Sequence, residues 1–129
     1  QIIERLFEVG VNIKDLNTVR KHLSLARGGY LAEYAYPAKV VSLIFSDVPG
    51  NNLEFIASGP TVRDTTSIAD AKKIIEYHDI VKRCSFPVGE LIETPKDEKF
   101  FRNVKNILVA TTLFCFLFFA PAAPLRKAF

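Results

Sequence analysis

Apolar side chains recur at helical spacing near the start of the chain and predict two helices. The first stripe comprises Ile2, Ile3, Leu6 and Phe7. It stops at Gly10, a residue that tolerates the left-handed conformation of a helix end. The second stripe comprises Leu16, Val19, Leu23 and Ala26. It starts after Asn12, which precedes Asp15 by three residues as in a capping box, and it ends before Gly28-Gly29.

The opposite face of the second predicted helix is polar. Asn17, Lys21 and Ser24 recur there at helical spacing, with Arg20 and Arg27 close by. Several hydrogen-bond donors therefore project from one side. This face is either a solvated surface or a binding surface, and the periodicity leaves both interpretations open.

The run from Val40 to Phe45 is short, β-branched and almost continuously apolar. Such a run is typical of a strand buried on both faces of a parallel sheet. It is followed at once by Ser46-Asp47-Val48-Pro49-Gly50. Ligands of open α/β sheets bind beyond the carboxyl ends of the strands, which makes Asp47 a candidate catalytic carboxylate. In the alternative interpretation, Asp47 only nucleates the Pro-Gly turn by bonding its own backbone.

The rest of the chain alternates turns with short elements. A possible extended piece at 53–56 leads into 57–61, Ala-Ser-Gly-Pro-Thr, which is either an oxyanion-binding loop or a rigid turn. Ser67 with Asp70 predicts the start of a helix that closes at 77–79. Further patterns predict a short helix over 86–92 and a strand over 104–109.

The C-terminal stretch differs in kind, because no charged residue occurs from Asn106 to Leu125. The aromatic run at 113–119 superficially resembles a membrane span, which needs roughly 20 apolar residues, but threonines and prolines shorten the apolar part to a marginal length. We therefore do not expect a membrane partner. The pattern divides the chain into residues 1–110 and an atypical apolar tail, 111–129.

Composition and charge exclude several classes of protein. A chain of 129 residues with 49% apolar and 24% charged residues is long enough for one domain with a real core. The net charge of +3 is too small and dispersed for a nucleic-acid partner. Neither the two cysteines nor the two histidines stand at metal-ligand spacing, and two unpaired thiols favour the cytoplasm.

Four ordered motifs resemble the bacterial and animal two-domain glycerate kinases, sometimes labelled hydroxypyruvate reductases, over residues 2–110. The motifs are Asn17-Thr18-Val19-Arg20-Lys21-His22-Leu23-Ser24, Gly28-Gly29-Tyr30-Leu31-Ala32, Ser46-Asp47-Val48-Pro49-Gly50 and Ile56-Ala57-Ser58-Gly59-Pro60-Thr61-Val62. The resemblance implies an α/β fold, a fragment of a Rossmann-like parallel sheet flanked by helices. It also implies ATP-dependent phosphorylation of D-glycerate to 2-phosphoglycerate, with ATP and Mg²⁺ as cofactors.

The resemblance covers only the middle of the family's N-terminal domain. The family's Ser-Gly-Gly-Gly-Ser phosphate loop would precede Gln1, and its C-terminal domain would follow Phe129. We therefore expect the chain alone to be inactive. The tail departs from the family's pattern, and a change of reading frame near Ala110 is our hypothesis for that departure.

The resemblance also assigns candidate site residues. Asp47 would be the catalytic base or hydroxyl-orienting group, with Mg²⁺ coordination as the second possibility. Substrate-binding candidates are Arg20, Lys21 and Ser24. Candidates that line the cleft or bind phosphate are Ser46, Gly50, Ser58, Gly59 and Thr61. In the alternative interpretation, Arg20 and Lys21 only brace the domain through ion pairs.

Two departures weaken the inferred metal site and leave other functions open. Asn51 stands where the family usually has Asp, and Arg63 stands where Pro is common. A rival to the enzyme is a non-catalytic remnant or module that serves association or membrane attachment. Hydride transfer to hydroxypyruvate is a weaker alternative, because the sequence contains no GxGxxG dinucleotide fingerprint.

Overall fold

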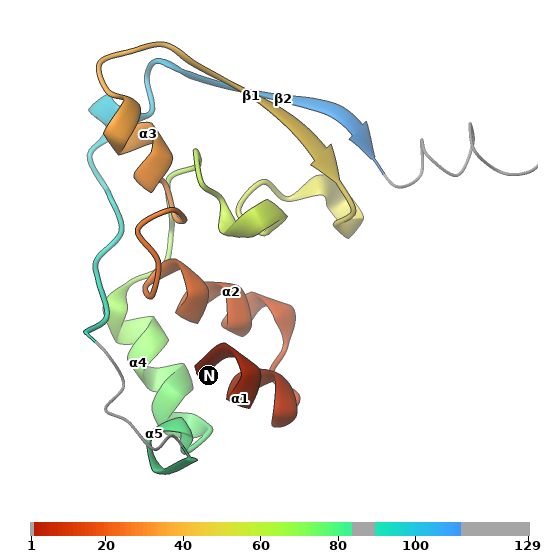
Figure 1. Ribbon diagram of the computed structural model, residues 1–129, viewed down its shortest axis with the longest axis vertical. Coiled ribbons are helices and arrows are strands. Elements are labelled where there is room, and N and C mark those ends of the chain that lie inside the picture. The colour runs from red at the N-terminus through yellow and green to blue at the C-terminus, as the bar shows by residue number, and fades with distance from the viewer. Residues whose placement is uncertain (1, 84–89, 112–129) are drawn as a thin grey trace, which may run out of the picture.

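The computed structural model describes residues 2–83 and 90–111, in which three helices precede the first strand and two more separate it from the second (Figure 1). The helices and strands, in order, are α1 Ile2–Glu8, α2 Ile13–Lys21, α3 Tyr30–Ala35, β1 Val40–Ser46, α4 Ile68–Tyr77, α5 Ile80–Arg83 and β2 Val104–Thr111. Three short 3-10 turns are η1 Pro49–Asn51, η2 Ile56–Ser58 and η3 Glu98–Phe100. The architecture is α/β, as expected.

The hydrophobic core lies among the helices α1, α2, α4 and α5. It is built from Ile2, Leu6, Leu16, Val19, Ala71, Ile75 and Ile80. Within α1, α2 and α4 these residues lie three or four positions apart, so each of these short helices turns one apolar side to the others, and α5 adds Ile80. The two apolar stripes of the sequence therefore predicted the core residues of α1 and α2, whereas the stripe residue Phe7 is 58% exposed.

Polar caps fix where these helices begin. The Asn12 side chain accepts a hydrogen bond from the Asp15 backbone N–H at 2.9 Å, and Ser67 and Asp70 form a complete capping box on α4. Gly10 follows α1 with a φ of +72°, the left-handed conformation predicted for it. Both predicted helix starts are confirmed.

The end of α2 was predicted incorrectly. The helix ends at Lys21 rather than continuing to Ala26. Beyond it, the His22 carbonyl accepts a hydrogen bond from the Ile92 backbone N–H, and Gly28 donates to the Ser58 carbonyl, both at 2.9 Å. These long-range hydrogen bonds replace the helical ones, because they dock the segment after α2 against two distant parts of the chain.

The strands β1 and β2 are parallel, with Val40 opposite Val104 at one end and Ser46 opposite Thr111 at the other. The segment 55–60 lies between the sheet and α2 (Figure 1). Both strands were predicted, but burial of β1 on both faces was not confirmed for the described residues. Val41, Leu43 and Phe45 are 60%, 65% and 71% exposed.

Other expectations fail or fall outside the described residues. The extended piece at 53–56 is wrong, because this stretch forms turns that lead into η2. The helix over 86–92 falls mostly on residues 84–89, which lie outside the described residues, and 90–92 is irregular. The tail from 112 onward also lies outside them. None of the helices in residues 2–83 and 90–111 is long and apolar enough to cross a membrane.

Candidate functional site

Asp47 directly follows β1, and its side chain is exposed. Its carboxylate makes no hydrogen bond or ion pair with any residue in the described part of the chain. Other residues make the hydrogen bonds of the turn that follows. The Ser46 hydroxyl accepts a hydrogen bond from the Val48 backbone N–H at 3.2 Å, and the Asn51 backbone N–H donates to the Val48 carbonyl at 3.0 Å. Asp47 is therefore not the residue that nucleates this turn.

Gly50 supports the same turn through its backbone. It has a φ of +77° inside η1, and nothing lies within 4 Å of where a Cβ would be. The glycine is therefore needed for the conformation of the turn, and its surroundings are open. A phosphate-binding role for Ser46 or Gly50 stays a prediction.

The second turn of the candidate site is held in a left-handed conformation. Ala57, Ser58 and Gly59 have φ values of +50°, +60° and +61°. The N–H groups of Gly28 and Gly29 donate to the carbonyls of Ser58 and Gly59, both at 2.9 Å. Two glycine motifs that lie 30 residues apart in sequence are thus hydrogen-bonded to each other.

The hydroxyl groups of this turn bond within the chain. Ser58 donates to the Asn17 side-chain oxygen at 3.0 Å, and both residues are buried. Thr61 accepts from Ser42 at 3.1 Å and donates to Asn106 at 2.7 Å, which links the turn to both strands. These contacts are those of the rigid-turn alternative, and an oxyanion-binding role for Ser58, Gly59 or Thr61 stays a prediction.

The polar face of α2 is not a solvated surface where it carries Asn17 and Lys21, because each is only 2% exposed. The Lys21 ammonium donates to Asp64 at 2.9 Å and to Glu54 at 3.0 Å. It therefore joins α2 to both ends of the segment that carries the second turn. These are the bracing contacts of the alternative interpretation, and substrate binding by Lys21 stays a prediction.

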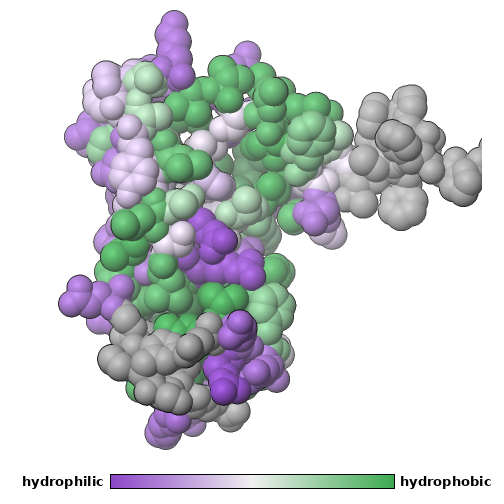
Figure 2. All heavy atoms as spheres, in the orientation of Figure 1, coloured by the Kyte–Doolittle hydropathy of each residue, from purple (hydrophilic) through white to green (hydrophobic). Residues whose placement is uncertain are grey.

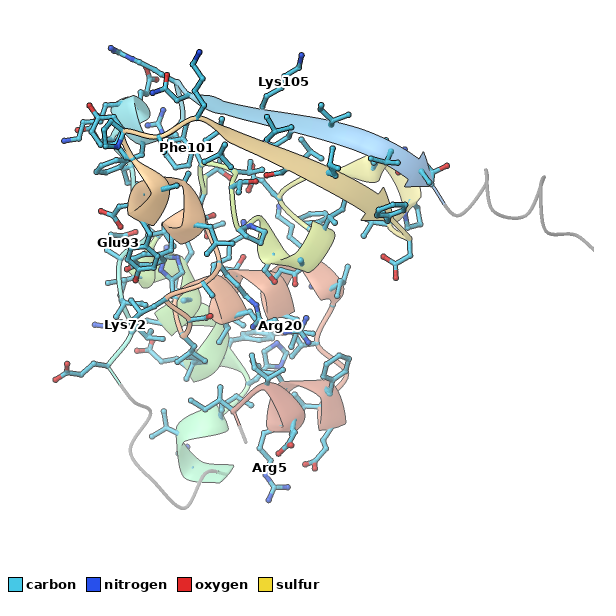
Figure 3. All side chains as sticks on the ribbon, turned by 45° about the horizontal axis from the view of Figure 1, so that its top comes forward. Arg5, Arg20, Lys72, Glu93, Phe101 and Lys105 are labelled. Atoms are coloured by element: carbon cyan, nitrogen blue, oxygen red, sulfur yellow. The ribbon has the colours of Figure 1, made fainter. Side chains whose placement is uncertain are left out.

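The other two substrate-binding candidates lie apart from this ion pair. The Arg20 guanidinium, labelled in Figure 3, lies 5.8 Å from the centre of the Phe7 ring, a cation–π contact with α1. The Ser24 hydroxyl accepts a hydrogen bond from the Ala26 backbone N–H at 3.3 Å. Both side chains are partly exposed, and their substrate roles stay predictions.

Sequence reasoning missed the buried carboxylate at the centre of this network, Asp64. One oxygen accepts from Lys21 and from the Thr66 backbone N–H at 3.0 Å, and the other accepts from the Thr94 hydroxyl at 3.0 Å. Lys96 donates to the backbone carbonyls of Asp64 and Thr66. Asp64 forms an Asx-turn with the Thr66 backbone N–H, an interaction that any residue at position 66 could make, so the local sequence carries no distinctive signal for it.

The network also determines the ionisation of Asp64. Burial raises the pKa of this carboxyl group. The hydrogen bond from Lys21, the Thr66 backbone N–H and the positive charge of Lys21 lower the pKa, and together they hold it below its ordinary value. Asp64 is therefore a charged, fully bonded structural group.

Residues 1–93, which include both turns and Asp64 with its partners Lys21 and Thr66, match the family described as a domain of unknown function, DUF4147. The chain belongs to the DUF4147 family. The match covers α1 through α5 and β1, so Asp47 and the candidate residues of α2 all lie inside it.

Relatives of this DUF4147 chain bear the names of glycerate kinases. The glycerate 2-kinase of Pyrococcus horikoshii is 44% identical over 115 residues, which cover 82% of this chain and 26% of that protein. The D-glycerate 2-kinase of Thermotoga maritima is 45% identical over 96 residues, 74% of this chain and 23% of that protein. The chain thus spans about a quarter of the length of these curated relatives.

A solved structure confirms the fold of this DUF4147 chain. The crystal structure of a glycerate kinase from Thermotoga maritima superposes with a TM-score of 0.70 and 42% identity, over 84% of this chain and 25% of that one. At this identity the likeness extends beyond the general fold to the family. The predicted resemblance to the glycerate kinases is therefore confirmed.

Proposed function

We propose that the chain forms part of an enzyme that phosphorylates D-glycerate with ATP and yields 2-phosphoglycerate. The names of its relatives support the reaction class. The observation that carries the proposal is an exposed carboxylate without a described partner, Asp47, at the carboxyl end of a parallel strand. In this proposal the chain, with Asp47, is part of a longer protein, which we place in the cytoplasm.

In the proposed reaction, Asp47 accepts a hydrogen bond from the reacting hydroxyl group of glycerate. As the hydroxyl oxygen bonds to the γ-phosphorus of ATP, the carboxylate takes up the hydroxyl proton. The bond between the γ-phosphorus and its bridging oxygen breaks, and ADP leaves. Phosphoryl transfer requires mainly positioning from the protein, and a carboxylate free of internal hydrogen bonds can position a substrate hydroxyl.

The Asp47 carboxylate is a suitable ligand for a magnesium ion. Mg²⁺ is commonly held by one or two carboxylates together with substrate phosphates and water. Asp47 is an available carboxylate of this kind, and it would be the ligand that this chain provides. When bound, Mg²⁺ supplies positive charge to the phosphate oxygens of ATP. In the described residues, no three His, Cys, Asp or Glu side chains cluster to form a complete metal site.

The cationic candidates divide into two groups. Lys21 is buried in ion pairs with Asp64 and Glu54, so its contribution is to hold the 54–64 segment in place. Arg20 is partly exposed and lacks a carboxylate partner in the described part of the chain, so it is the better candidate for the glycerate carboxylate. The phosphate loop and the C-terminal domain belong, in this proposal, to the rest of the longer protein.

A chimeric enzyme tests the proposal. This chain's matching segment would replace its counterpart in the Pyrococcus horikoshii glycerate 2-kinase, to which it is 44% identical. We expect ATP-dependent phosphorylation of D-glycerate, measured as ADP release, and no oxidation of NADH with hydroxypyruvate. A folded chimera that oxidises NADH instead would favour the reductase alternative. A folded chimera without either activity would contradict the proposed function.

A further inference from the structure

The loop that carries Asp47 is anchored at its first end by the sheet. It begins at Ser46, the last residue of β1, which is buried and lies opposite Thr111 of β2. From there the chain turns back through η1 toward α2 (Figure 1). A paired strand is a more rigid support than a loop, so the backbone is fixed one residue before Asp47.

The hydrogen bonds inside this loop are local. The Asn52 side-chain oxygen accepts from the Glu54 backbone N–H at 2.9 Å, and the Asn52 carbonyl accepts from the Phe55 backbone N–H at 3.0 Å. In the described part of the chain, residues 47–53 make no hydrogen bond to a residue outside 46–56. These bonds keep the loop compact, but they do not attach it to the rest of the molecule.

The second anchor of the loop is the carboxylate of Glu54, seven residues after Asp47. It accepts hydrogen bonds from Lys21 Nζ at 3.0 Å and from the Thr65 hydroxyl at 3.1 Å. The side chains of Glu54 and Lys21 are 25% and 2% exposed, so water and salt screen this ion pair less than a surface pair. Figure 2 shows hydrophilic residues gathered in the middle of the molecule, between hydrophobic residues over the sheet and over the helices. The ion pair ties the far end of the loop to α2.

We propose that Glu54 is a positioning residue, which holds the loop so that the Asp47 carboxylate faces the reacting hydroxyl group of the substrate. Because Glu54 acts through Asp47, this role rests on the proposed function. Lys21 provides the fixed point, since Asp64 holds its ammonium group at 2.9 Å from the other side. Displacement of a reacting group by about 1 Å can cost about 10²-fold in rate, so a loosened anchor affects the reaction without touching the substrate.

Glu54 can be changed without breaking the buried ion pair beside it. Glu54→Ala leaves Lys21 bonded to Asp64, so neither buried charge loses its last partner. The variant should therefore fold, and its effect on the loop can be measured separately from the stability of the network. The matched control is Glu98→Ala, because the Glu98 carboxylate forms an ion pair of the same length, 3.0 Å, with Arg63 at the surface.

The kinetics of the chimeric kinase test the positioning role. We expect Glu54→Ala to lower kcat about tenfold without changing the KM for ATP, and Glu98→Ala to change neither. In an Asp47→Asn background, Glu54→Ala should lower kcat no further, because the position of the loop matters only while it carries the carboxylate. Independent losses that multiply would overturn the inference. A Glu54→Ala enzyme within about twofold of the parent would also overturn it, and would leave the proposed function intact if Asp47→Asn is slow.

Amide hydrogen exchange in the full 129-residue chain tests the anchor independently of activity. The Asn51 and Phe55 amides close the turns of the loop, so their exchange reports how often it opens. We expect Glu54→Ala to accelerate exchange at these two amides about tenfold and to leave the amides of α4 unchanged. Unchanged exchange at both amides, or equal acceleration in α4, would overturn the inference. An inactive parent chimera would remove the proposed function, whereas exchange would still decide whether Glu54 holds the loop.

Discussion

Two aspartates differ in what surrounds them, and the difference determines what each can do. Asp64 is buried and accepts hydrogen bonds from Lys21, Thr66 and Thr94. A carboxylate bonded in this way stabilises the fold and cannot receive a proton from a substrate at ordinary pH. Asp47 is exposed at the end of β1 without a described partner, so it keeps its oxygens available for a substrate or an ion.

The ionisation of Asp64 predicts how stability depends on pH. Its pKa is below its ordinary value of about 3.9, so its contribution to folding is complete above about pH 4 and is lost as the pH falls through the lower folded-state value. We expect Asp64→Asn to destabilise the chain at pH 5 to 7, and the difference from the natural sequence to shrink at lower pH. Urea denaturation at several pH values measures this difference. A difference independent of pH from 6 to 2 would contradict the account.

Removal of the cation in this network should also be costly. Lys21→Met leaves the buried Asp64 carboxylate without its main charged partner, and loss of one member of a buried pair costs about 3–5 kcal/mol. The control is Lys82→Met, because the Lys82–Asp79 ion pair is exposed at the surface. Urea midpoints should fall for Lys21→Met and stay unchanged for Lys82→Met. Equal midpoints for the two variants would rule out the bracing role of Lys21.

At the scale of elements, two glycine motifs hold the candidate site together. The Gly28-Gly29 segment precedes α3 and hydrogen-bonds to the turn around Ser58 and Gly59. A Cβ at Gly28 would lie 2.6 Å from the Thr94 methyl group, and one at Gly29 would lie 2.7 Å from the Phe101 ring. The glycines are therefore needed for close packing as well as for backbone conformation.

A matched pair of glycine substitutions separates these two requirements. Gly28 and Gly10 have φ values of +58° and +72°, but nothing lies within 4 Å of a Cβ at Gly10. Gly10→Ala should cost about 1–2 kcal/mol because of its left-handed conformation alone. Gly28→Ala should cost about 1–3 kcal/mol more, because the new methyl group collides with Thr94. Urea denaturation measures both, and equal losses would show that packing at Gly28 is unimportant.

Local signals predicted the elements better than their ends and their burial. The apolar stripes, the Asn12 and Ser67 caps and the run from Val40 to Phe45 all predicted elements that form. The end of α2 could not be predicted, because hydrogen bonds to residues 58 and 92 determine it. The position of Asp47 after β1 was predicted, whereas the pairing of Lys21 with Asp64, 43 residues away, leaves no local pattern.

At the scale of the whole molecule, the chain matches about a quarter of the length of its kinase relatives. In residues 2–83 and 90–111, the segment around η2 and Thr61 lies against one face of the sheet, and Leu43 and Phe45 are exposed on the other. The candidate carboxylate lies at the carboxyl end of that sheet. In the proposed function, Asp47 therefore acts within a longer protein that supplies the remaining parts of the site.

The most direct test of the central claim is the rate of D-glycerate phosphorylation by the chimeric kinase with Asp47→Asn. This change keeps the size of the side chain and removes its capacity to take up a proton. We predict that kcat falls by about 10²–10⁴-fold. The matched control is Asp79→Asn, at an exposed aspartate in the turn after α4, which should keep full activity. A folded Asp47→Asn enzyme within about twofold of the parent rate would contradict the assignment of Asp47 to the chemical step.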